Sequence, residues 1–536
     1  RFGMSDTTDK ANLYETKYEV GQDNLQKWGM DVHHPVFWIA SALVLIFVIG
    51  TLVAPGPAKE ALDGAKWWSI AKFDWLFMLA ANVFVVFSLV LIFLPVGKIR
   101  LGGDKAKPEF SYMSWFAMLF AAGMGIGLMF WSVAEPTAYY TGWYETPLGV
   151  EANSAAAQQK AMSATMFHWG LHPWAIYAVV ALSLAFFSFN KGLPLTIRSA
   201  FYPLIKDHSW GPFGHLIDTI AVVATLFGLA TSLGFGAQQA AAGIEFLSGV
   251  SSENAGDNFG IQLAIILGVT AVALISVLRG LDGGVKVLSN INMGIAGLLL
   301  LFVLIAGPTA VIFSTIGSTA VGYVQDIFAY SNWVGRDDEA WMQGWTVFYW
   351  AWWISWSPFV GMFIARVSYG RTVREFIIAV LLVPTLVTLV WMSVFGGSAL
   401  DQITSGVGQL ADGLSSVELA MFQMLENLPM AAITSGIGII LVLVFFITSS
   451  DSGSLVIDAI TAGGKVDAPV VQRIFWVVIE GVVAAALLFG GGADALAALQ
   501  AAAITVGLPF TLVLLVMCVS LYLGLKHEKD YVSERA

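Results

Sequence analysis

Residues 346–366 read TVFYWAWWISWSPFVGMFIAR, and this stretch decides the fold class that the sequence predicts. Its first 20 residues carry no charge, and about 20 apolar residues are enough for one helical crossing of a bilayer. Pro358 and Gly361 lie near the middle of the run, where a proline removes a helical hydrogen bond and clashes with the preceding turn. The stretch therefore predicts a transmembrane helix that is interrupted near its centre.

Four tryptophans fall within seven residues of this run; they are Trp350, Trp352, Trp353 and Trp356. An aromatic belt or ordinary core packing is one interpretation, but belt tryptophans gather at the membrane interfaces, and these reach the middle of the span. The alternative, which we favour, is an aromatic wall that faces a ligand. A quaternary ammonium group has no N–H to donate, so ring faces are its natural partners.

The composition restricts the class of protein. The chain has 536 residues, of which 57% are hydrophobic and only 12% are charged, whereas soluble domains carry about 25% charged residues. The net charge of −11 excludes the basic surface that nucleic-acid binding requires. The single cysteine, Cys518, offers neither an intrachain disulfide nor a cysteine metal site. An all-α polytopic membrane protein is predicted, and no nucleophile–base pair or metal-ligand set favours an enzyme.

Twelve apolar spans can be read between a tail at 1–35 and a short tail at 525–536. Because the number is even, both termini are predicted on the same side of the membrane. Amphipathic connectors lie near 195–207 and 317–333. The spans are 36–56, 73–95, 113–140, 168–189, 216–247, 261–279, 290–315, 343–366, 374–397, 430–450, 473–491 and 500–524.

The lysines and arginines predict which side the termini occupy. If both ends are cytoplasmic, 21 of the 26 basic residues fall in cytoplasmic segments. The five in the outer loops are Lys59, Lys66, Lys72, Lys160 and Arg336. An excess of positive charge is typical of cytoplasmic loops, so both termini are predicted in the cytoplasm.

The third span carries glycines at every second position, Gly123, Gly125 and Gly127. Each glycine costs a helix about 1 kcal/mol relative to alanine. Close helix packing through small residues is one explanation. The other is an unwound segment that lines a cavity, because non-helical backbone is tolerated at membrane depth only there.

The two interrupted spans, the third and the eighth, lie five spans apart. Paired interrupted helices at corresponding positions indicate an inverted-repeat transporter with a site near the membrane midplane. Two peripheral helices at 36–95 would precede a first five-helix repeat at 113–315 and a second at 343–524, joined by the connector at 317–333.

The fourth span contributes a second aromatic group, Trp169, Trp174 and Tyr177. On a helix, Trp174 and Tyr177 are neighbours on one face. His168 and His172 have the i, i+4 spacing of a metal-binding pair, but no third ligand lies nearby. Hydrogen-bonded or interfacial histidines are therefore the default interpretation.

Hydroxyls at the end of the tenth span allow two interpretations. Thr448 and Ser449 either bond back to the preceding turn or, with carbonyls of the unwound third span, bind Na⁺. For Na⁺ we extend the preference of other hard cations for oxygen ligands. A proton-driven pump would carry acids within the membrane; the interrupted spans are expected to have none at their breaks, and Glu480 is the clearest intramembrane acid.

Four blocks of the sequence resemble the betaine–choline–carnitine transporter (BCCT) family. The resemblance implies a five-plus-five inverted repeat shared with the leucine-transporter group, with two extra N-terminal helices, usually as a homotrimer in the bacterial cytoplasmic (inner) membrane. It also implies Na⁺ as the coupling ion and no organic cofactor. The blocks are the glycine stretch 123–130, the aromatic segment 168–177, the tryptophan run with its continuation at 371–376, and 446–449.

The resemblance also implies roles for individual residues. In betaine carriers an aromatic box holds the trimethylammonium group, and its members match Trp169, Trp174, Tyr177 and Trp353. Trp352 and Trp356 match positions along the permeation path, and Met124 and Gly127 lie where the glycine stretch lets the substrate approach. The main sodium site matches carbonyls of Ala121, Met124 and Phe445 and hydroxyls of Thr448 and Ser449.

Three features place the chain within that family. Choline carriers tend to have an aspartate where this chain has Gly127, so a net-neutral zwitterion is favoured. One hydroxyl of the family's proposed second sodium site is kept by Thr225, but the other position is Leu229 and neighbouring Thr231 faces elsewhere on a helix. The tail after 525 is short, which argues against osmotic activation through a long basic helix.

The predicted function is Na⁺-coupled symport of a small methylated onium zwitterion, glycine betaine or dimethylsulfoniopropionate, by alternating access. Such a carrier would serve compatible-solute or nutrient uptake. The alternatives are a sodium-independent exchanger or a carrier of choline, carnitine or ectoine. The rival from another class is a membrane-embedded sensor or enzyme.

Overall fold

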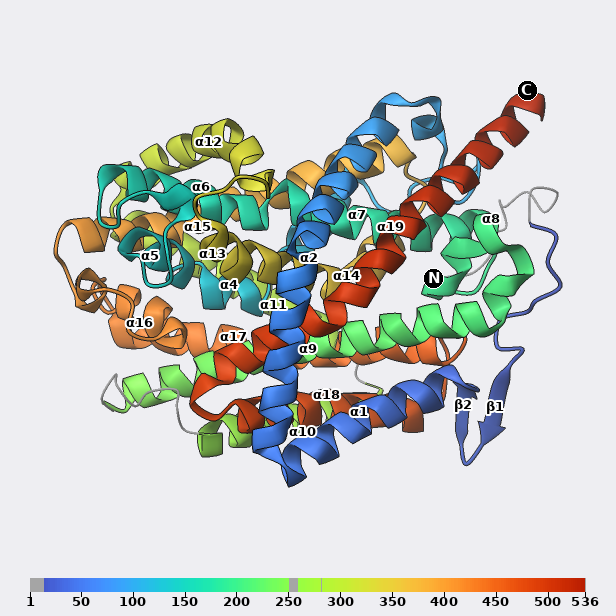
Figure 1. Cartoon of the computed structure of the whole chain (residues 1–536), viewed down its shortest axis with the longest axis horizontal. Helices are drawn as coiled ribbons and strands as arrows, with labels where there is room; N and C mark the ends of the chain where they lie inside the picture. The colour runs from blue at the N-terminus through green and yellow to red at the C-terminus, as the bar shows by residue number, and fades with distance from the viewer. Residues whose placement is uncertain (1–13, 250–258, 281, 536) are drawn as a thin grey trace.

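Helices make up most of the computed structural model, which describes residues 14–249, 259–280 and 282–535 (Figure 1). A short antiparallel hairpin, β1 (Asn24–Lys27) and β2 (Met30–His33), precedes them. Within these ranges nine helices are long and apolar enough to cross a membrane, or ten if one bent pair counts as a single span. Because a helix satisfies its own backbone hydrogen bonds, this architecture suits a bilayer. The prediction of an all-α polytopic membrane protein is confirmed.

The first half of the chain contains the broken third span. It begins with two long helices, the second of which bends at Phe73, where the backbone leaves helical geometry. The helices are α1 (Val36–Val53), α2 (Pro55–Phe93), α3 (Tyr112–Ala122), α4 (Ile126–Trp131), α5 (Ala134–Thr141), α6 (Ala155–Trp169), α7 (Leu171–Ala185), α8 (Tyr202–Ile205), α9 (Pro212–Leu247), α10 (Phe259–Arg279) and α11 (Asp282–Ala306).

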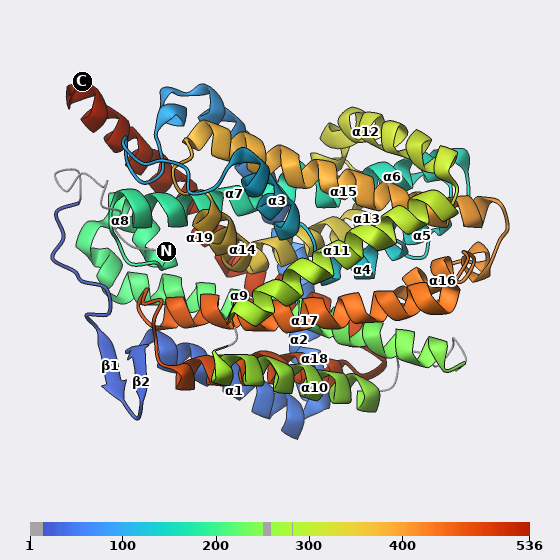
Figure 2. The same ribbon diagram turned by 180° about the vertical axis from the view of Figure 1, so that it is seen from behind.

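The second half places the tryptophan run at the centre of the molecule. Its helices are α12 (Thr309–Ser331), α13 (Glu339–Trp341), α14 (Val347–Val367), α15 (Val373–Thr404), α16 (Ala420–Leu425), α17 (Ala431–Thr461), α18 (Val470–Gly491) and α19 (Ala495–Arg535). Helix α14 packs against α7, α9 and α19. Helices α2 and α19 cross in front of it (Figure 1), and α10 lies along α18 at the lower edge (Figure 2).

Helix α14 corrects the prediction made from the stretch 346–366. The helix is continuous although Pro358 lies inside it. Pro358 has no N–H for the carbonyl of Ile354, but the hydroxyl of Ser357 donates to that carbonyl at 2.6 Å. Gly361 instead allows close packing, since a Cβ there would lie 3.1 Å from the backbone of α7. The interruption predicted for the eighth span is therefore wrong.

Four predicted span boundaries are also wrong. Helix α17 continues to its end at 461, so the hydroxyls at 448–449 lie within a helix rather than at its end. Helix α11 ends at 306, because Pro308 disfavours helical geometry in the residue before it, and residues 309–315 belong to α12. The fourth span begins at 155 and breaks at Gly170. The predicted start of the second span, at 73, is the bend inside α2.

Candidate functional site

A break in the third span opens the centre of the helix bundle. Helix α3 ends at 122 and α4 begins at 126, and the helix axes on either side differ by 55°. Gly125, between them, is fully extended, with φ −180° and ψ −170°. A Cβ at Gly123 would lie 3.3 Å from the ring of Trp174 on α7. The structure thus contains the unwound segment that the alternating glycines predicted, and this segment borders a cavity.

The cavity offers about 100 Å³ to the centres of water-sized molecules, compared with about 10–15 Å³ for one bound water. Every residue predicted to contact the substrate lines it. These residues are Met124, Gly127, Trp169, Trp174, Tyr177, Trp352, Trp353 and Trp356. Ser232, Phe359 and Thr388 also line the cavity and were not predicted. A single hydroxyl or ring in a long apolar helix carries no distinguishing pattern.

Aromatic rings from three helices meet in this cavity. Trp169 ends α6, Trp174 and Tyr177 lie in the first turns of α7, and Trp353 lies in α14. The ring centroids of Trp169 and Trp353 are 4.8 Å apart, at an interplanar angle of 68°. Trp174 and Tyr177 are 5.1 Å apart, and Tyr177 and Trp353 are 6.4 Å apart. These three contacts join the four predicted box residues into one connected group. Trp352, outside the box, stacks on Trp353 at 4.5 Å.

The direction of α7 depends on a close approach at Gly170. A Cβ at Gly170 would lie 2.6 Å from the hydroxyl oxygen of Tyr323, so glycine alone leaves room for α12 at this distance. The Tyr323 hydroxyl accepts a hydrogen bond from the backbone N–H of Leu171 at 2.9 Å. This bond satisfies one of the free N–H groups at the start of α7. The connector helix α12 thereby helps to fix how α7 presents its rings.

Polar groups at the ring edges hold the indoles in place. Trp353 donates its Nε1–H to the carbonyl of His168 at 2.9 Å. Trp352 donates its Nε1–H to the hydroxyl of Ser232 at 3.1 Å. Because these N–H groups are already used, the two rings offer their faces to a ligand rather than hydrogen bonds.

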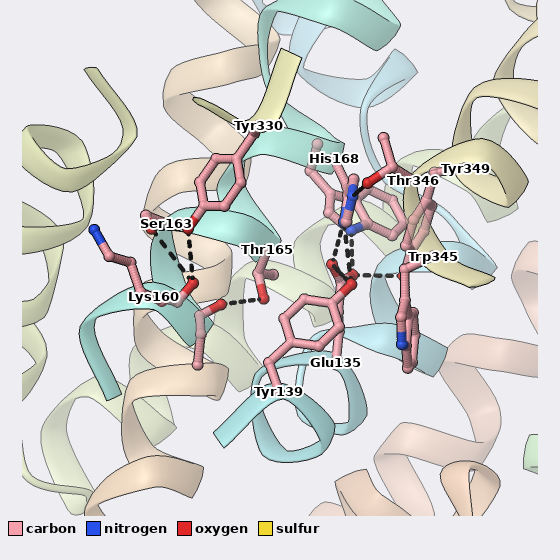
Figure 3. Close-up of polar contacts among 12 residues, drawn as sticks. Glu135, Tyr139, Lys160, Ser163, Thr165, His168, Tyr330, Trp345, Thr346 and Tyr349 are labelled. Atoms are coloured by element: carbon pink, nitrogen blue, oxygen red, sulfur yellow. Dashed lines mark hydrogen bonds and ion pairs between the residues drawn. The ribbon is translucent and has the colours of Figure 1, made fainter. Parts of the chain in front are cut away.

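A buried carboxylate behind these rings was missed by the sequence analysis. Glu135, the second residue of α5, is fully buried and accepts the Nε1–H of Trp169 at 2.8 Å. Figure 3 shows it among His168, Tyr139 and Tyr349. The residues of the break at 123–125 carry no acid, and Glu135 lies farther along, in the helical part of the third span that runs from 126 to 141. The available signal was one acidic residue in an otherwise apolar span.

The two histidines of the fourth span have separate partners. Nδ1 of His168 lies 2.8 Å from Oε2 of Glu135, whereas Nε2 of His172 lies 3.0 Å from Oδ1 of Asn82. Trp350 stacks on His172, with ring centroids 5.2 Å apart, and does not line the cavity. Both histidines are hydrogen-bonded, as the default interpretation expected.

Two of the five predicted sodium ligands line the cavity and three do not. Ser449 lines it together with Met124. The Thr448 hydroxyl donates to the carbonyl of Phe445 at 3.2 Å, and the carbonyl of Ala121 accepts the N–H of Met124 at 3.2 Å. All five ligating atoms would be oxygens, the type that hard cations prefer. Ala121, Phe445 and Thr448 are not among the cavity-lining residues of the described chain.

Other candidate ion-binding groups are engaged in helix contacts. The Thr225 hydroxyl donates to the carbonyl one turn earlier at 2.7 Å. Thr231 donates to the carbonyl of Leu499 at 3.1 Å. Glu480 is fully buried on α18 and accepts the hydroxyl of Ser450 at 2.9 Å. None of these side chains lines the cavity in the described ranges.

Comparison with known proteins gives a consistent result. Residues 35–530 match the family model described as BCCT, betaine/carnitine/choline family transporter. Glycine betaine transporter 1 of Vibrio parahaemolyticus is 64% identical over 529 residues, which cover 98% of this chain and 100% of that protein. A glycine betaine/proline/choline/ectoine transporter of the same bacterium is 59% identical over 528 residues, covering 98% and 93%. Glycine betaine transporter OpuD of Bacillus subtilis is 44% identical over 502 residues, covering 93% and 96%.

Proposed function

Because the chain belongs to the betaine/carnitine/choline transporter family, we propose that it takes up a small methylated onium zwitterion together with Na⁺. It is a transporter and not an enzyme, as the sequence predicted. Glycine betaine is the first candidate substrate, and dimethylsulfoniopropionate is the second. The observation that carries this proposal is the cavity beside the unwound third span, where the rings of α6, α7 and α14 meet.

The lining of the cavity supports a cationic head group within a net-neutral molecule. Ring faces attract an onium group. None of the described residues that line the cavity carries a formal charge, so a free cation would have no direct counter-ion. A zwitterion carries its own carboxylate. One relative's name includes proline, choline and ectoine besides glycine betaine, and the family description includes carnitine. Choline, carnitine and ectoine are therefore the alternative substrates.

Coupling to Na⁺ is proposed at the junction of the unwound third span and α17. The ligands would be the carbonyls of Ala121, Met124 and Phe445 and the hydroxyls of Thr448 and Ser449. The shared cavity wall of Met124 and Ser449 supports this position, because an ion there would lie beside the substrate. A site that joins two elements is complete only when they are close together. If ion and substrate both bind the outward-open form best, differential affinity couples them.

Membership of the family also leads us to propose twelve membrane crossings arranged as two inverted repeats. Helix α14 is not among the nine helices counted above, but its 21 residues give it the length of a span. Helices α18 and α19 are separate helices on either side of the 3₁₀ turn at 492–494. With the broken third span, these additions bring the crossings to twelve. The stretches α3–α11 and α14–α19 would be the two inverted repeats, and α1 and α2 would lie outside them. We further propose a homotrimer in the bacterial inner membrane, with both termini cytoplasmic.

Uptake into proteoliposomes tests the proposal. An inward Na⁺ gradient is expected to drive accumulation of radiolabelled glycine betaine above the level reached when K⁺ replaces Na⁺. Uptake that ignores the Na⁺ gradient and needs substrate inside the vesicles would establish a sodium-independent exchanger instead. Competition by dimethylsulfoniopropionate, choline, carnitine and ectoine, at high and zero Na⁺, ranks the substrates.

Substitution of Gly127 by alanine is expected to weaken glycine betaine binding by about tenfold. A Cβ at Gly127 would lie 2.9 Å from the ring of Trp169 and 3.0 Å from that of Trp352, and such overpacking costs about 1–3 kcal/mol. Gly268→Ala is the matched control, because Gly268 lies on α10 away from the cavity and a Cβ there would meet no atom within 4 Å. Calorimetric titration should show near-wild-type affinity for Gly268→Ala. Equal losses in the two variants would contradict the assigned role of Gly127.

A further inference from the structure

We propose that Glu135, which lies behind the cavity wall, is a positioning residue that gives the aromatic cavity its selectivity for a positively charged head group. Its carboxylate fixes the ring of Trp169 and makes that ring more electron-rich. The proposal rests on the proposed function, because it assumes an onium group bound against Trp169 and Trp353. It assigns part of the recognition to a residue that does not touch the substrate.

The carboxylate of Glu135 is surrounded by hydrogen-bond partners (Figure 3). Oε1 accepts the hydroxyl of Tyr349 at 2.5 Å and the Nε1–H of Trp169 at 2.8 Å. Oε2 accepts the hydroxyl of Tyr139 at 2.8 Å and lies 2.8 Å from Nδ1 of His168. These partners lie on α5, α6 and the central helix α14. One side chain therefore joins three helices around the cavity.

The hydrogen-bond pattern also assigns a charge to this cluster. The indole N–H of Trp169 can only donate, and the hydroxyls of Tyr139 and Tyr349 can both donate as well, so the pattern fits an ionised carboxylate. Nδ1 of His168 then carries a proton, while its Nε2 lies 2.9 Å from the hydroxyl of Thr346, which can donate to it. With Thr346 as that donor, His168 is neutral and the cluster keeps one negative charge, which is the state that the proposal requires. Arg336 is held in an ion pair with Asp338 at 2.8 Å and does not form an ion pair with Glu135.

The charge of Glu135 reaches the cavity through the indole of Trp169. A hydrogen bond to an ionised acceptor is strong, and hydrogen-bonded groups in a low-dielectric interior polarise one another. A ring whose N–H is bonded to a carboxylate therefore has a more negative face, which binds an onium group more tightly. A neutral group of the same shape gains nothing from this charge. Trp353 is tied to the same cluster, because it donates to the carbonyl of His168 at 2.9 Å.

Two ligands of the same shape separate charge recognition from packing. Glycine betaine and 3,3-dimethylbutanoate share a carboxylate and a head group with three methyls, but only glycine betaine carries a positive charge there. In the purified full-length chain, Glu135→Gln is expected to weaken glycine betaine binding by about tenfold while the affinity for 3,3-dimethylbutanoate stays within about twofold. Both affinities are measured by competition against radiolabelled glycine betaine.

Two further variants control this experiment. Glu135→Asp keeps the charge and is expected to preserve the ratio of the two affinities, even where both fall. Glu480→Gln replaces another fully buried carboxyl, outside the cavity, by an amide and should leave the ratio at the wild-type value. An unchanged ratio in Glu135→Gln would overturn the proposal, whether both affinities fall together or neither changes.

The outcome stays informative if Glu135→Gln does not fold, as judged by gel filtration. Glu135→Asp then decides, because a preserved ratio supports recognition through charge and a collapsed ratio contradicts it. A wild-type chain that does not bind glycine betaine at all would reject the proposed function instead. The two failures are therefore distinguishable.

Discussion

Replacing Trp353 with alanine is expected to weaken glycine betaine binding by about a hundredfold. The centroid of this ring lies 4.8 Å from that of Trp169, 6.4 Å from that of Tyr177 and 4.5 Å from that of Trp352. A desolvated cation–π contact is worth about 2 kcal/mol or more. Removing the ring also takes away the surface on which its neighbours rest. A total loss of about 3 kcal/mol corresponds to two factors of ten, at about 1.4 kcal/mol each.

A matched pair of phenylalanine variants separates this role from general packing. Trp350 belongs to the same run and is fully buried, but it stacks on His172 outside the cavity. Trp350→Phe is expected to keep the wild-type affinity, while Trp353→Phe should lie between wild type and Trp353→Ala. Calorimetric titration with glycine betaine measures all three. If Trp353→Ala bound glycine betaine as tightly as wild type, Trp353 would not belong to the binding site.

The aromatic residues of the cavity could be predicted because their signal is local. Trp352 and Trp353 stand side by side in one run, and Trp169, Trp174 and Tyr177 fall within nine residues of each other. The alternating glycines of the third span are equally compact. Spacing alone did not show that these segments meet, since that contact depends on how α7 packs against α14. The resemblance to a known family supplied the pairing.

Pro358 and Glu135 show two ways in which a local pattern fails. Pro358 indicates a break, but the neighbouring hydroxyl of Ser357 satisfies the carbonyl that the proline leaves free, and the helix continues. For Glu135 the sequence indicated no role, although the structure shows one. Its role depends on Trp169 and Tyr349, which are 34 and 214 residues away. One acid in a span has no evident function until the fold brings these donors to it.

The tenth span shows why falling hydropathy does not mark the end of a helix. The sequence turns polar at 448–452, yet α17 continues for another nine residues, to 461. Two of these polar side chains are satisfied by the neighbouring helix α18. Asp451 pairs with Arg473 at 2.8 Å, and Ser450 donates to Glu480 at 2.9 Å. A buried polar group that is hydrogen-bonded costs little, so the helix has no reason to stop there.

The double variant Thr448→Ala, Ser449→Ala is expected to abolish the dependence of glycine betaine affinity on Na⁺. Coupling between two ligands is typically about 1–3 kcal/mol, or about 5–150-fold in affinity, and the wild-type chain should fall in that range between zero and high Na⁺. Without the two hydroxyls, α17 offers the ion only the carbonyl of Phe445 from the proposed ligand set. Titrations of the double variant in Na⁺ and in K⁺ should then give the same affinity for glycine betaine. That affinity should equal the one that the wild-type chain shows without Na⁺.

The ratio of the affinities with and without Na⁺ (the Na⁺ response), rather than either affinity alone, decides this test, because Ser449 lines the cavity in which we propose that the substrate binds. A hydroxyl lost beside the substrate alone would lower affinity equally with and without Na⁺. Thr434→Ala is the control, since it removes a buried hydroxyl of the same helix that bonds back to the carbonyl of Met430 at 3.3 Å, and it should keep the full response. A response that survives in the double variant would place coupling outside this ligand set. If the Na⁺ response is lost while the affinity without Na⁺ stays at the wild-type value, the coupling site lies between the unwound third span and α17.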